Sequence, residues 1–349
     1  DVVLSRQSSW ASLRDKVSAG LLEGGQMLAP MPLALALGLG APATQVVSAM
    51  VLSRNGNGIT LARRIAQQLP THPDGDPLAT AQALATVIRE RGRPLRLATV
   101  YPWSSHQLQL LDWLAYAGLA PGDDIELTAI APARMLEALR EGIVDGCCVG
   151  EPWNSLAQHQ GLGDLLVSSH EIWQNAPEKV LGMRADWVDA HPDLHQRLLM
   201  ALVEACRWLD DPANHADLKG LLALPTWLDE AGAELAQIPL GPFHPRIGQH
   251  FFRDQANFPW QSQARWLLDR LQHYGLCSEL AGGLAEATVE TCIRPDLYRA
   301  AAHALGLDAP AIDGKTEGVH PQPFPVPGAS GAVAVAGDAL LGQSSFRWP

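Results

Sequence analysis

The pattern of apolar and polar positions divides this chain into two stretches. Through residue 185, short apolar runs typical of buried strands alternate with segments of helical periodicity. This alternation predicts βα units and a largely parallel sheet. From residue 192 onward the pattern indicates helices. Residues 306–349, rich in Gly, Pro and Ala, predict an irregular tail packed on the surface, although composition alone favours a mobile tail equally.

Capping residues, glycines and prolines delimit the predicted elements. Ser9 is expected to cap the first helix and Gly20 to end it, and the prolines among residues 70–78 predict a surface loop. The predicted strands span residues 2–4, 26–28, 46–52, 95–100, 125–130, 144–149, 164–168 and 179–183. The predicted helices span residues 10–19, 33–39, 60–69, 79–91, 105–118, 192–210, 212–222, 227–237, 262–275, 278–288 and 294–304.

The order of these elements predicts an α/β fold with two lobes. If the chain crosses from one lobe to the other near residues 92 and 186, the second lobe is an insertion in the first. Lobe I is then expected to comprise residues 1–91 and 186–305, and lobe II residues 92–185, with a ligand between them. The length of 349 residues agrees, because single cores rarely grow beyond about 250–300 residues.

Composition and charge narrow the classes of function. With 47% hydrophobic and 18% charged residues, the chain resembles ordinary globular proteins. A net charge of −12 argues against direct binding of nucleic acid, which requires a basic surface. No apolar run approaches the ~20 residues of a membrane span. Any anion site on this acidic chain must create its own local positive potential.

The five cysteines indicate neither a disulfide framework nor a zinc site. Their number is odd, Cys147 and Cys148 are adjacent, and no C-x-x-C pair is present. A reducing cytoplasm is therefore expected. A signal peptide before residue 1 would instead indicate a periplasmic or membrane-anchored protein.

The chain carries no recognisable catalytic motif after a predicted strand. It lacks the G-x-S-x-G elbow, the phosphate loop, the H-E-x-x-H pair and the G-x-G-x-x-G turn. His191 and His195 have the helical spacing of metal ligands, but they open a helix beside Pro192, where solvated side chains are the simpler explanation. The sequence thus predicts a binding protein, not an enzyme, without a metal or cofactor.

A turn at residues 149–154, Val-Gly-Glu-Pro-Trp-Asn, is the most informative stretch. It follows a short buried strand and opens a new helix, where Pro152 suits the first helical position. Glu151, Trp153 and free backbone N–H groups are thereby expected at the carboxyl end of a strand. In open α/β sheets ligands bind at that edge.

A second strand-to-helix turn, residues 101–106, carries Trp103 and His106. Ser104 or Ser105 is expected to cap the helix, which leaves the positive end of its dipole and free N–H groups available to a ligand. His106 then lies in the first turn of this helix and points toward the same ligand position. An ordinary surface histidine at a helix start is the alternative.

Two further segments offer donors to a ligand. Lys179 begins an apolar strand, where it either reaches for solvent along the sheet edge or supplies charge for an anion. Residues 55–58, Asn-Gly-Asn-Gly, follow an apolar strand. Asn55 and Asn57 offer amide donors, and the glycines leave backbone N–H groups accessible, although an ordinary turn explains this segment equally well.

Together these segments resemble the nitrate- and bicarbonate-binding proteins of ABC transporters and their soluble relatives that sense nitrate and nitrite. The resemblance extends over nearly the whole chain, and the Gly-Glu-Pro-Trp-Asn block is its most specific part. It is carried by Ser9-Trp10-Ala11, Arg14-Asp15-Lys16-Val17, Met31-Pro32, Asn55-Gly56-Asn57-Gly58-Ile59, Trp113-Leu114-Ala115, Val149-Gly150-Glu151-Pro152-Trp153-Asn154 and Glu178-Lys179-Val180-Leu181-Gly182.

The resemblance implies a two-lobed periplasmic-binding-protein-like (type II) fold that closes on a small planar oxyanion. Members usually begin with another βα unit, so the first such unit is expected to be missing here. In nitrate-binding members a lysine and a histidine contact the anion, and Lys179 and His106 match those positions. Bicarbonate members tend to carry an acidic residue in place of the lysine, which favours nitrate or nitrite.

One position departs from the pattern of the transporter members. They place a Trp in the segment before Met-Pro, whereas this chain has Met27 within Gln26-Met27-Leu28. Stacking on the anion from that side is therefore in doubt. The predicted site residues are Lys179, His106, Asn57, Asn55, Met27, Trp103, Glu151 and Trp153.

The resemblance leaves three functions open. The segment Lys315-Thr316-Glu317-Gly318, with His320, looks more like the cytoplasmic sensors, which release an RNA-binding antiterminator protein when nitrate arrives. The first alternative is a transporter subunit that delivers nitrate, bicarbonate or an organic anion to an ABC permease. The second is an enzyme of the same fold acting on thiamine-precursor pyrimidines, for which Cys147 and Cys148 are the only candidate nucleophiles.

Overall fold

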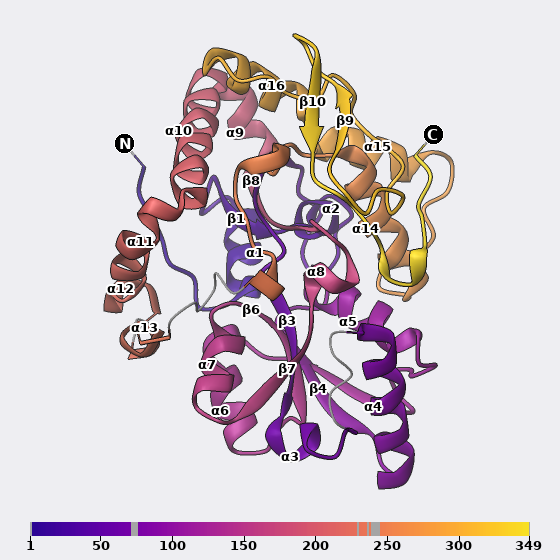
Figure 1. The fold of residues 1–349 in the computed structure, drawn as a ribbon. Helices are drawn as coiled ribbons and strands as arrows, with labels where there is room; N and C mark the ends of the chain where they lie inside the picture. Colours follow the sequence, from indigo (N-terminus) through magenta and orange to yellow (C-terminus); the bar gives the residue numbers. More distant parts are fainter. Residues whose placement is uncertain (1, 71–75, 229, 236, 239–244, 349) are drawn as a thin grey trace.

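Two β-sheets, one above the other in Figure 1, organise the chain. The computed structural model describes residues 2–70, 76–228, 230–235, 237–238 and 245–348. The upper, three-stranded sheet has the order β1-β8-β2, formed by Gly24–Leu28, Pro177–Arg184 and Val46–Arg54. The lower, five-stranded sheet has the order β5-β4-β6-β3-β7, formed by Ile125–Ala129, Leu95–Thr99, Gly146–Gly150, Asn57–Ala62 and Gly163–Ser168. We call the parts built on these sheets lobe I and lobe II.

The strand directions differ from the largely parallel sheet that the sequence predicts. Strand β4 runs parallel to β5 and β6, but β3 runs antiparallel to β6 and β7. The sheet of lobe I is antiparallel throughout. The prediction of parallel strands is wrong because β3 and β8 do not return through helices. Each enters its sheet directly from the other lobe.

The chain crosses between the lobes at two places. Strand β2 ends at Arg54 in lobe I, and β3 begins at Asn57 in lobe II. The return passes through residues 173–176 into β8, which lies between β1 and β2. Sheet membership therefore places the crossings near residues 55 and 175, whereas the sequence pattern suggests residues 92 and 186.

The helix predicted over residues 60–69 is wrong, because most of this stretch is strand β3. All six residues of β3 are buried between neighbouring strands, and a buried central strand shows no alternation that would distinguish it from a helix. Only residues 63–66 form a helical turn, α3 (Arg63–Ala66). The predicted strand at residues 2–4 is also wrong, since Val2, Val3 and Leu4 are exposed and form no strand.

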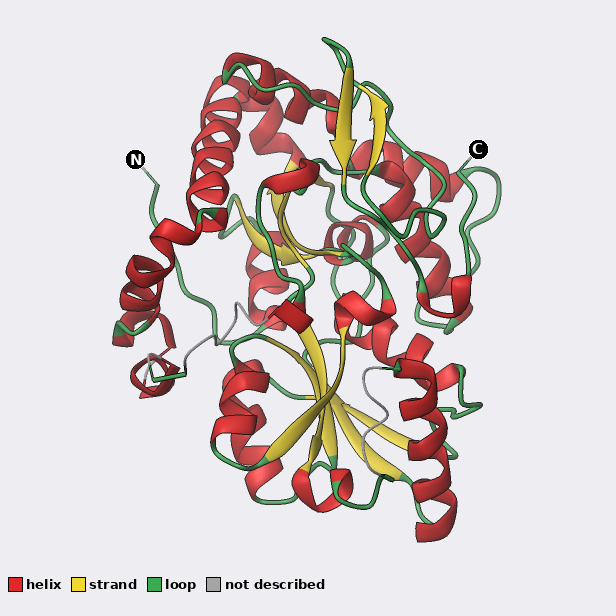
Figure 2. Ribbon diagram, viewed as in Figure 1, coloured by secondary structure: helices red, strands yellow, loops and turns green. Residues whose placement is uncertain are grey.

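Helices cover both sheets, as Figure 2 shows, and most begin at predicted positions. Ser9 caps α1 through its side chain, as expected, and Ser104 caps α5 by accepting from the Gln107 N–H at 3.1 Å. Lobe II carries α4 (Pro77–Arg91), α5 (Ser105–Ala115), η1 (Pro132–Arg134), α6 (Met135–Arg140), α7 (Trp153–His159) and α8 (Ser169–Ile172). Lobe I carries α1 (Trp10–Ser18), α2 (Met31–Ala36), α9 (Ala185–Ala190), α10 (Pro192–Asp210), α14 (Gln261–His273), α15 (Leu284–Cys292) and α16 (Pro295–Ala304).

Short helices and the tail complete the chain. Residues 71–75, within the predicted loop, lie outside the described residues, and α15 begins six residues later than predicted. The intervening short helices are η2 (Pro212–Asn214), α11 (His215–Leu222), α12 (Pro225–Leu228), α13 (Glu230–Leu235), η4 (Pro245–Ile247) and η5 (Arg253–Gln255). Among the described helices, none combines the length and apolar character needed to span a membrane.

The C-terminal tail packs on lobe I and contains more regular structure than predicted. A hairpin of β9 (Phe324–Pro327) and β10 (Ala332–Val335) stands at the top of lobe I in Figure 1, where β10 contacts η5, and η6 (Leu341–Gln343) follows. Val326, Val333 and Val335 enter the same apolar cluster as Phe258 and Tyr298. The tail is therefore part of the folded body of lobe I.

Candidate functional site

A buried carboxylate, Glu178, joins polar side chains from both lobes. One carboxylate oxygen, Oε1, accepts from the Lys179 ammonium at 2.6 Å and lies 3.5 Å from Nδ1 of His106. The other, Oε2, accepts from Nδ2 of Asn57 at 2.6 Å. Glu178 is only 2% exposed, so these partners replace its water. We call Glu178, Lys179, His106 and Asn57 the polar cluster.

The crossing strands explain why these four residues meet. Glu178 and Lys179 lie in β8 of lobe I, whereas Asn57 is the first residue of β3 in lobe II. His106 is the second residue of α5, also in lobe II. The cluster thus lies at the junction of the two sheets, with side chains contributed by each lobe.

A bulge in β8 brings two successive residues into one cluster. Along a regular strand, neighbouring side chains point to opposite faces. Opposite β2, however, Lys179 pairs with Ser53 and Pro177 pairs with Arg54, so Glu178 has no partner on that side. Such irregularities re-aim a side chain locally. Strand periodicity therefore does not predict that Glu178 shares a site with Lys179, and Glu178 is absent from the predicted site residues.

The Lys179 ammonium lies over an aromatic ring. Its Nζ is 5.4 Å from the centroid of the Trp10 ring, and its side chain is 17% exposed. Trp10 is the first residue of α1 and partly buried. A cation over a Trp face is attracted by the ring's electrons while the ring limits the access of water. Trp10 is a further residue that the predicted site omitted, although it stands in a motif that carries the resemblance.

Burial and charge decide the protonation of the cluster. The pKa of His106 is lowered to about 4, chiefly by burial; the charge of Glu178 opposes this shift, and the charge of Lys179 adds to it. Burial alone would raise the pKa of Glu178, but Lys179, His106 and Asn57 together hold it below its usual value. At neutral pH the histidine is therefore uncharged, the carboxylate ionised and the ammonium paired with it.

Room for a methyl group borders the cluster at Gly150, the last residue of β6. A Cβ atom placed on Gly150 would lie 3.4 Å from Oδ1 of Asn57 and 3.7 Å from Nε2 of His106, with no closer neighbour. Room for at least a methyl group therefore exists beside both polar side chains. Within the described residues, Oδ1 of Asn57 and Nδ1 of His106 are buried without a hydrogen-bond partner. Buried polar atoms without a partner are rare in proteins, and a bound ligand is one way in which they are satisfied.

The remaining predicted site residues have other partners in the structure. Asn55 adopts a positive φ of 52° at the crossing, and its side chain faces His170 at 3.0 Å. Met27 is fully buried in β1, where its sulfur packs against Gly182. Neither side chain has a contact with the polar cluster among those that the structure shows for the described residues.

The other three predicted site residues, Trp103, Glu151 and Trp153, also make contacts outside the polar cluster. The Trp103 indole donates to the carbonyl oxygen of Leu276 at 2.9 Å, which ties the start of α5 to lobe I. Glu151 accepts from the Ser155 N–H at 3.3 Å, and burial raises its pKa to about 7. Trp153 is half-buried and packs on the apolar core. The informative turn at residues 149–154 thus contributes chiefly Gly150 to the candidate site.

The two adjacent cysteines do not form a nucleophilic site. Cys147 and Cys148 are both buried in β6, within the apolar core. Burial raises the pKa of the Cys147 thiol to about 12, and that of Cys148 is also raised, first by burial. Thiols in such surroundings stay protonated and inert. In the part of the chain that the structure describes, no group of three or more His, Cys, Asp or Glu residues is arranged to hold a metal ion.

Comparison with known proteins shows which family has this architecture. The model of the NMT1-like family matches residues 1–223. The chain is 31% identical over 329 residues to the nitrate/nitrite binding protein NrtA of Synechocystis PCC 6803, covering 89% of this chain and 71% of that protein. It is 36% identical over 320 residues to the nitrate import ATP-binding protein NrtC of the same organism. That match covers 87% of this chain but only 46% of NrtC, so the chain spans about half the length of this relative.

A solved structure shows the same fold. The crystal structure of the periplasmic nitrate-binding protein NrtA from Synechocystis PCC 6803 superposes with a TM-score of 0.76 at 29% identity. The superposition covers 86% of this chain and 79% of that one. Its agreement with the family match confirms the two-lobed α/β fold that the resemblance implied. The chain belongs to the NMT1-like family, with the fold of the periplasmic substrate-binding proteins.

Proposed function

We propose that this chain binds nitrate or nitrite at the polar cluster, as the substrate-binding component of an import system. The observation that carries the proposal is the Lys179 ammonium, held between Glu178 and the Trp10 ring beside His106. The names of the relatives NrtA and NrtC, a nitrate/nitrite binding protein and a nitrate import ATP-binding protein, support the same ligand.

The chemistry of the cluster suits a planar oxyanion. Nitrate spreads one negative charge over three oxygens and accepts hydrogen bonds weakly, so its site needs a cation, several donors and few waters. Lys179 has one donor in the bond to Glu178 and retains two others. His106 and the N-terminal end of α5 supply a further donor and a partial positive charge. In a site this buried, each interaction is stronger than in water.

Binding is expected to draw the lobes together. Lys179 and Trp10 belong to lobe I, whereas His106 and Asn57 belong to lobe II. An anion that contacts both pairs stabilises the closed arrangement by its preference for that state over the open one. A membrane partner that recognises the closed form would then receive only the loaded protein.

Transport is supported better than sensing. The resemblance of residues 315–318 to the sensors favours a cytoplasmic protein that releases an RNA-binding antiterminator. By name, however, NrtA is a periplasmic nitrate-binding protein and NrtC is a nitrate import ATP-binding protein. We therefore propose a periplasmic site of action and an ABC permease with its ATPase as partners. The names of these relatives point to transport components and not to an antiterminator.

Isothermal titration calorimetry with nitrate, nitrite and bicarbonate tests the proposal. We expect binding of nitrate or nitrite in the native chain, and a loss of roughly a hundredfold or more in Lys179→Ala, because the Glu178 carboxylate then repels the anion. Lys16→Ala, which removes a lysine from the last turn of α1, is the matched control and is expected to bind normally. Circular dichroism checks that both variants are folded. Unchanged affinity in Lys179→Ala would refute the site.

A further inference from the structure

The polar cluster is electrically neutral before any ligand arrives. The single positive charge of Lys179 is matched by the carboxylate of Glu178 at 2.6 Å. The low pKa of His106, about 4, leaves its imidazole uncharged at neutral pH. The cluster therefore presents the ammonium group of Lys179 to a ligand, although its net charge is zero.

The groups beside His106 come from three strands. Strand β8 contributes Glu178 and Lys179, and β3 contributes the uncharged amide of Asn57. Strand β6 contributes Gly150. The thiol of Cys148 in the same strand interacts electrostatically with Glu178 and Lys179. Burial keeps this thiol protonated, since its pKa is raised well above the usual value. Glu178 is thus the anionic group, and Lys179 the cationic group, facing the imidazole.

A monoanion that enters this cluster changes its charge from zero to minus one. An uncompensated charge in a buried site is costly, and the usual response is a change in protonation. The gap of 3.5 Å between Nδ1 of His106 and Oε1 of Glu178 can close around one added proton. A proton there restores neutrality, whereas a dianion would still leave one negative charge uncompensated.

We propose that Glu178 determines the charge selectivity of the site: by cancelling the charge of Lys179, it makes a singly charged oxyanion enter together with one proton and excludes doubly charged anions. This inference rests on the proposed function. The proton comes from solvent and is held between His106 and Glu178. No covalent bond other than the one to this proton forms or breaks.

The sign of the pH dependence follows from linkage. The liganded protein holds more protons than the free protein, so acidification favours binding. Nitrate remains a monoanion throughout the accessible range, and its affinity is expected to rise as the pH falls from 8 toward 5.5. The limit of this rise is about tenfold per pH unit, which corresponds to one proton per anion.

Calorimetric titration with nitrate in two buffers of different ionisation enthalpy counts the protons. In the native chain we expect uptake that rises toward one proton per nitrate on acidification, and no detectable binding of sulfate. In Glu178→Gln, where the site gains a net positive charge, we expect no proton uptake. We also expect affinity for nitrate at pH 8 to rise on the order of tenfold, and sulfate to bind. Glu137→Gln, which makes the same charge change on α6, is the matched control and should behave as the native chain.

The outcomes separate this inference from the proposed function. Absence of nitrate and nitrite binding in the native chain would refute the function, and the inference with it. Binding without proton uptake between pH 5.5 and 8, or uptake that persists in Glu178→Gln, would overturn the role of Glu178 and leave the function intact. The proton count and the sulfate titration of the native chain decide the matter even if Glu178→Gln does not fold.

Discussion

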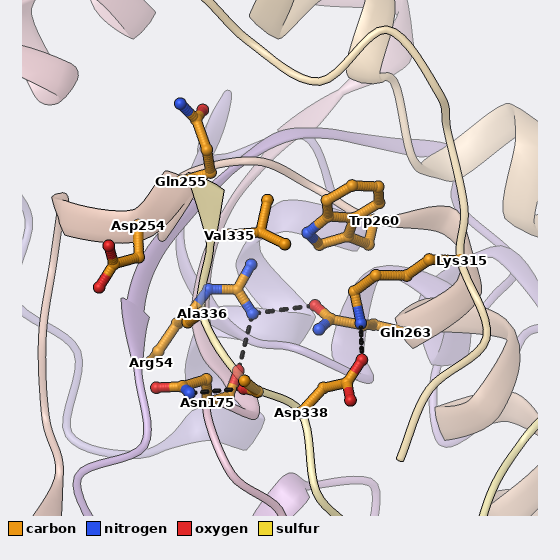
Figure 3. Close-up of a pocket in the computed structure, with 11 residues that line it drawn as sticks. Arg54, Asn175, Asp254, Gln255, Trp260, Gln263, Lys315, Val335, Ala336 and Asp338 are labelled. Atoms are coloured by element: carbon orange, nitrogen blue, oxygen red, sulfur yellow. Dashed lines mark hydrogen bonds and ion pairs between the residues drawn. The ribbon is translucent and has the colours of Figure 1, made fainter. Parts of the chain in front are cut away.

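The guanidinium of Arg54 donates through Nη1 to the carbonyl oxygen of Asn175 at 2.8 Å, and thereby joins the two segments on which the chain crosses between the lobes. Arg54 ends β2, and Asn175 lies two residues before β8. Asn175 in turn donates through its amide to the carbonyl oxygen of Gly337 in the tail at 2.6 Å. Figure 3 shows these contacts side by side around a small pocket of about 10 Å³.

Replacement of Arg54 is expected to destabilise the whole protein. Its guanidinium is fully buried and also donates to carbonyl oxygens of Ala256 and Phe258 and to the side chain of Gln263. Arg54→Met leaves these acceptors unpaired, so we expect the free energy of unfolding to fall by about 3–5 kcal/mol. Urea denaturation followed by Trp fluorescence measures it.

Arg54→Lys separates charge from geometry. A lysine keeps the positive charge but cannot reach four acceptors in fixed directions. We expect an intermediate loss of stability in this variant. A loss below about 1 kcal/mol in Arg54→Met would contradict the view that this side chain holds the crossing segments together.

The buried ion cluster of the tail gives a second prediction. Lys315 lies 2.5 Å from both Glu317 and Asp338, and all three side chains are buried (Figure 3 shows Lys315 and Asp338). Lys315→Met leaves two carboxylates without their cation, and repulsion between them is expected to loosen the tail. We expect faster amide hydrogen exchange over residues 315–340, measured by mass spectrometry.

A compensating change checks the cause of this loosening. Asp338→Asn in the Lys315→Met background removes one of the two negative charges, so protection of the tail should recover in part. Equal exchange in the native chain and in Lys315→Met would show that the apolar contacts of the hairpin hold the tail without the ion cluster.

Gly150 provides a steric test of the candidate site. An alanine there meets its nearest atoms at ordinary contact distances, so Gly150→Ala is expected to fold normally. Its methyl group would nevertheless occupy the space beside His106 and Asn57. We expect nitrate affinity to fall by about tenfold or more, as measured by calorimetry, with little change in melting temperature. Gly220→Ala, where a Cβ has open space, is the control, and equal affinity in both variants would move the ligand elsewhere.

Asp112 is expected to make the stability depend on pH. Burial raises its pKa to about 6, against the hydrogen bond from the Tyr274 hydroxyl at 2.6 Å and the charge of Arg270, which lower it. Because this pKa lies above the value of about 3.9 in the unfolded chain, the carboxyl group stabilises the fold below pH 4. That contribution is lost as the pH rises to 6.

The variant Asp112→Asn isolates this contribution. It keeps an acceptor for the Tyr274 hydroxyl but does not titrate. The difference in unfolding free energy between native chain and variant should change by up to about 3 kcal/mol between pH 4 and pH 7, in the direction that favours the variant at pH 7. A difference that does not vary with pH would show that Asp112 has an ordinary pKa.

Local sequence signals determined many helix starts and several strands. Ser9 and Ser104 cap their helices as predicted, and the apolar runs at residues 46–52, 95–100 and 164–168 are strands in the structure. These features depend on hydrogen bonds between residues close in sequence and on the burial of one short apolar run. They can therefore be predicted from the local sequence. The resemblance added the two-lobed fold, which the comparisons confirm.

The tertiary structure alone decided which strand joins which sheet and which side chains share the polar cluster. Strand β3 joins the sheet of lobe II, and β8 joins the sheet of lobe I. Both placements depend on neighbouring strands that lie far away along the chain. The bulge at Glu178 likewise appears only in the pairing of β8 with β2. Sequence periodicity reports how a segment is buried but not which segment buries it. For this reason Lys179 and His106 were proposed from the sequence, whereas Glu178, which joins them, emerged only when the strands were paired.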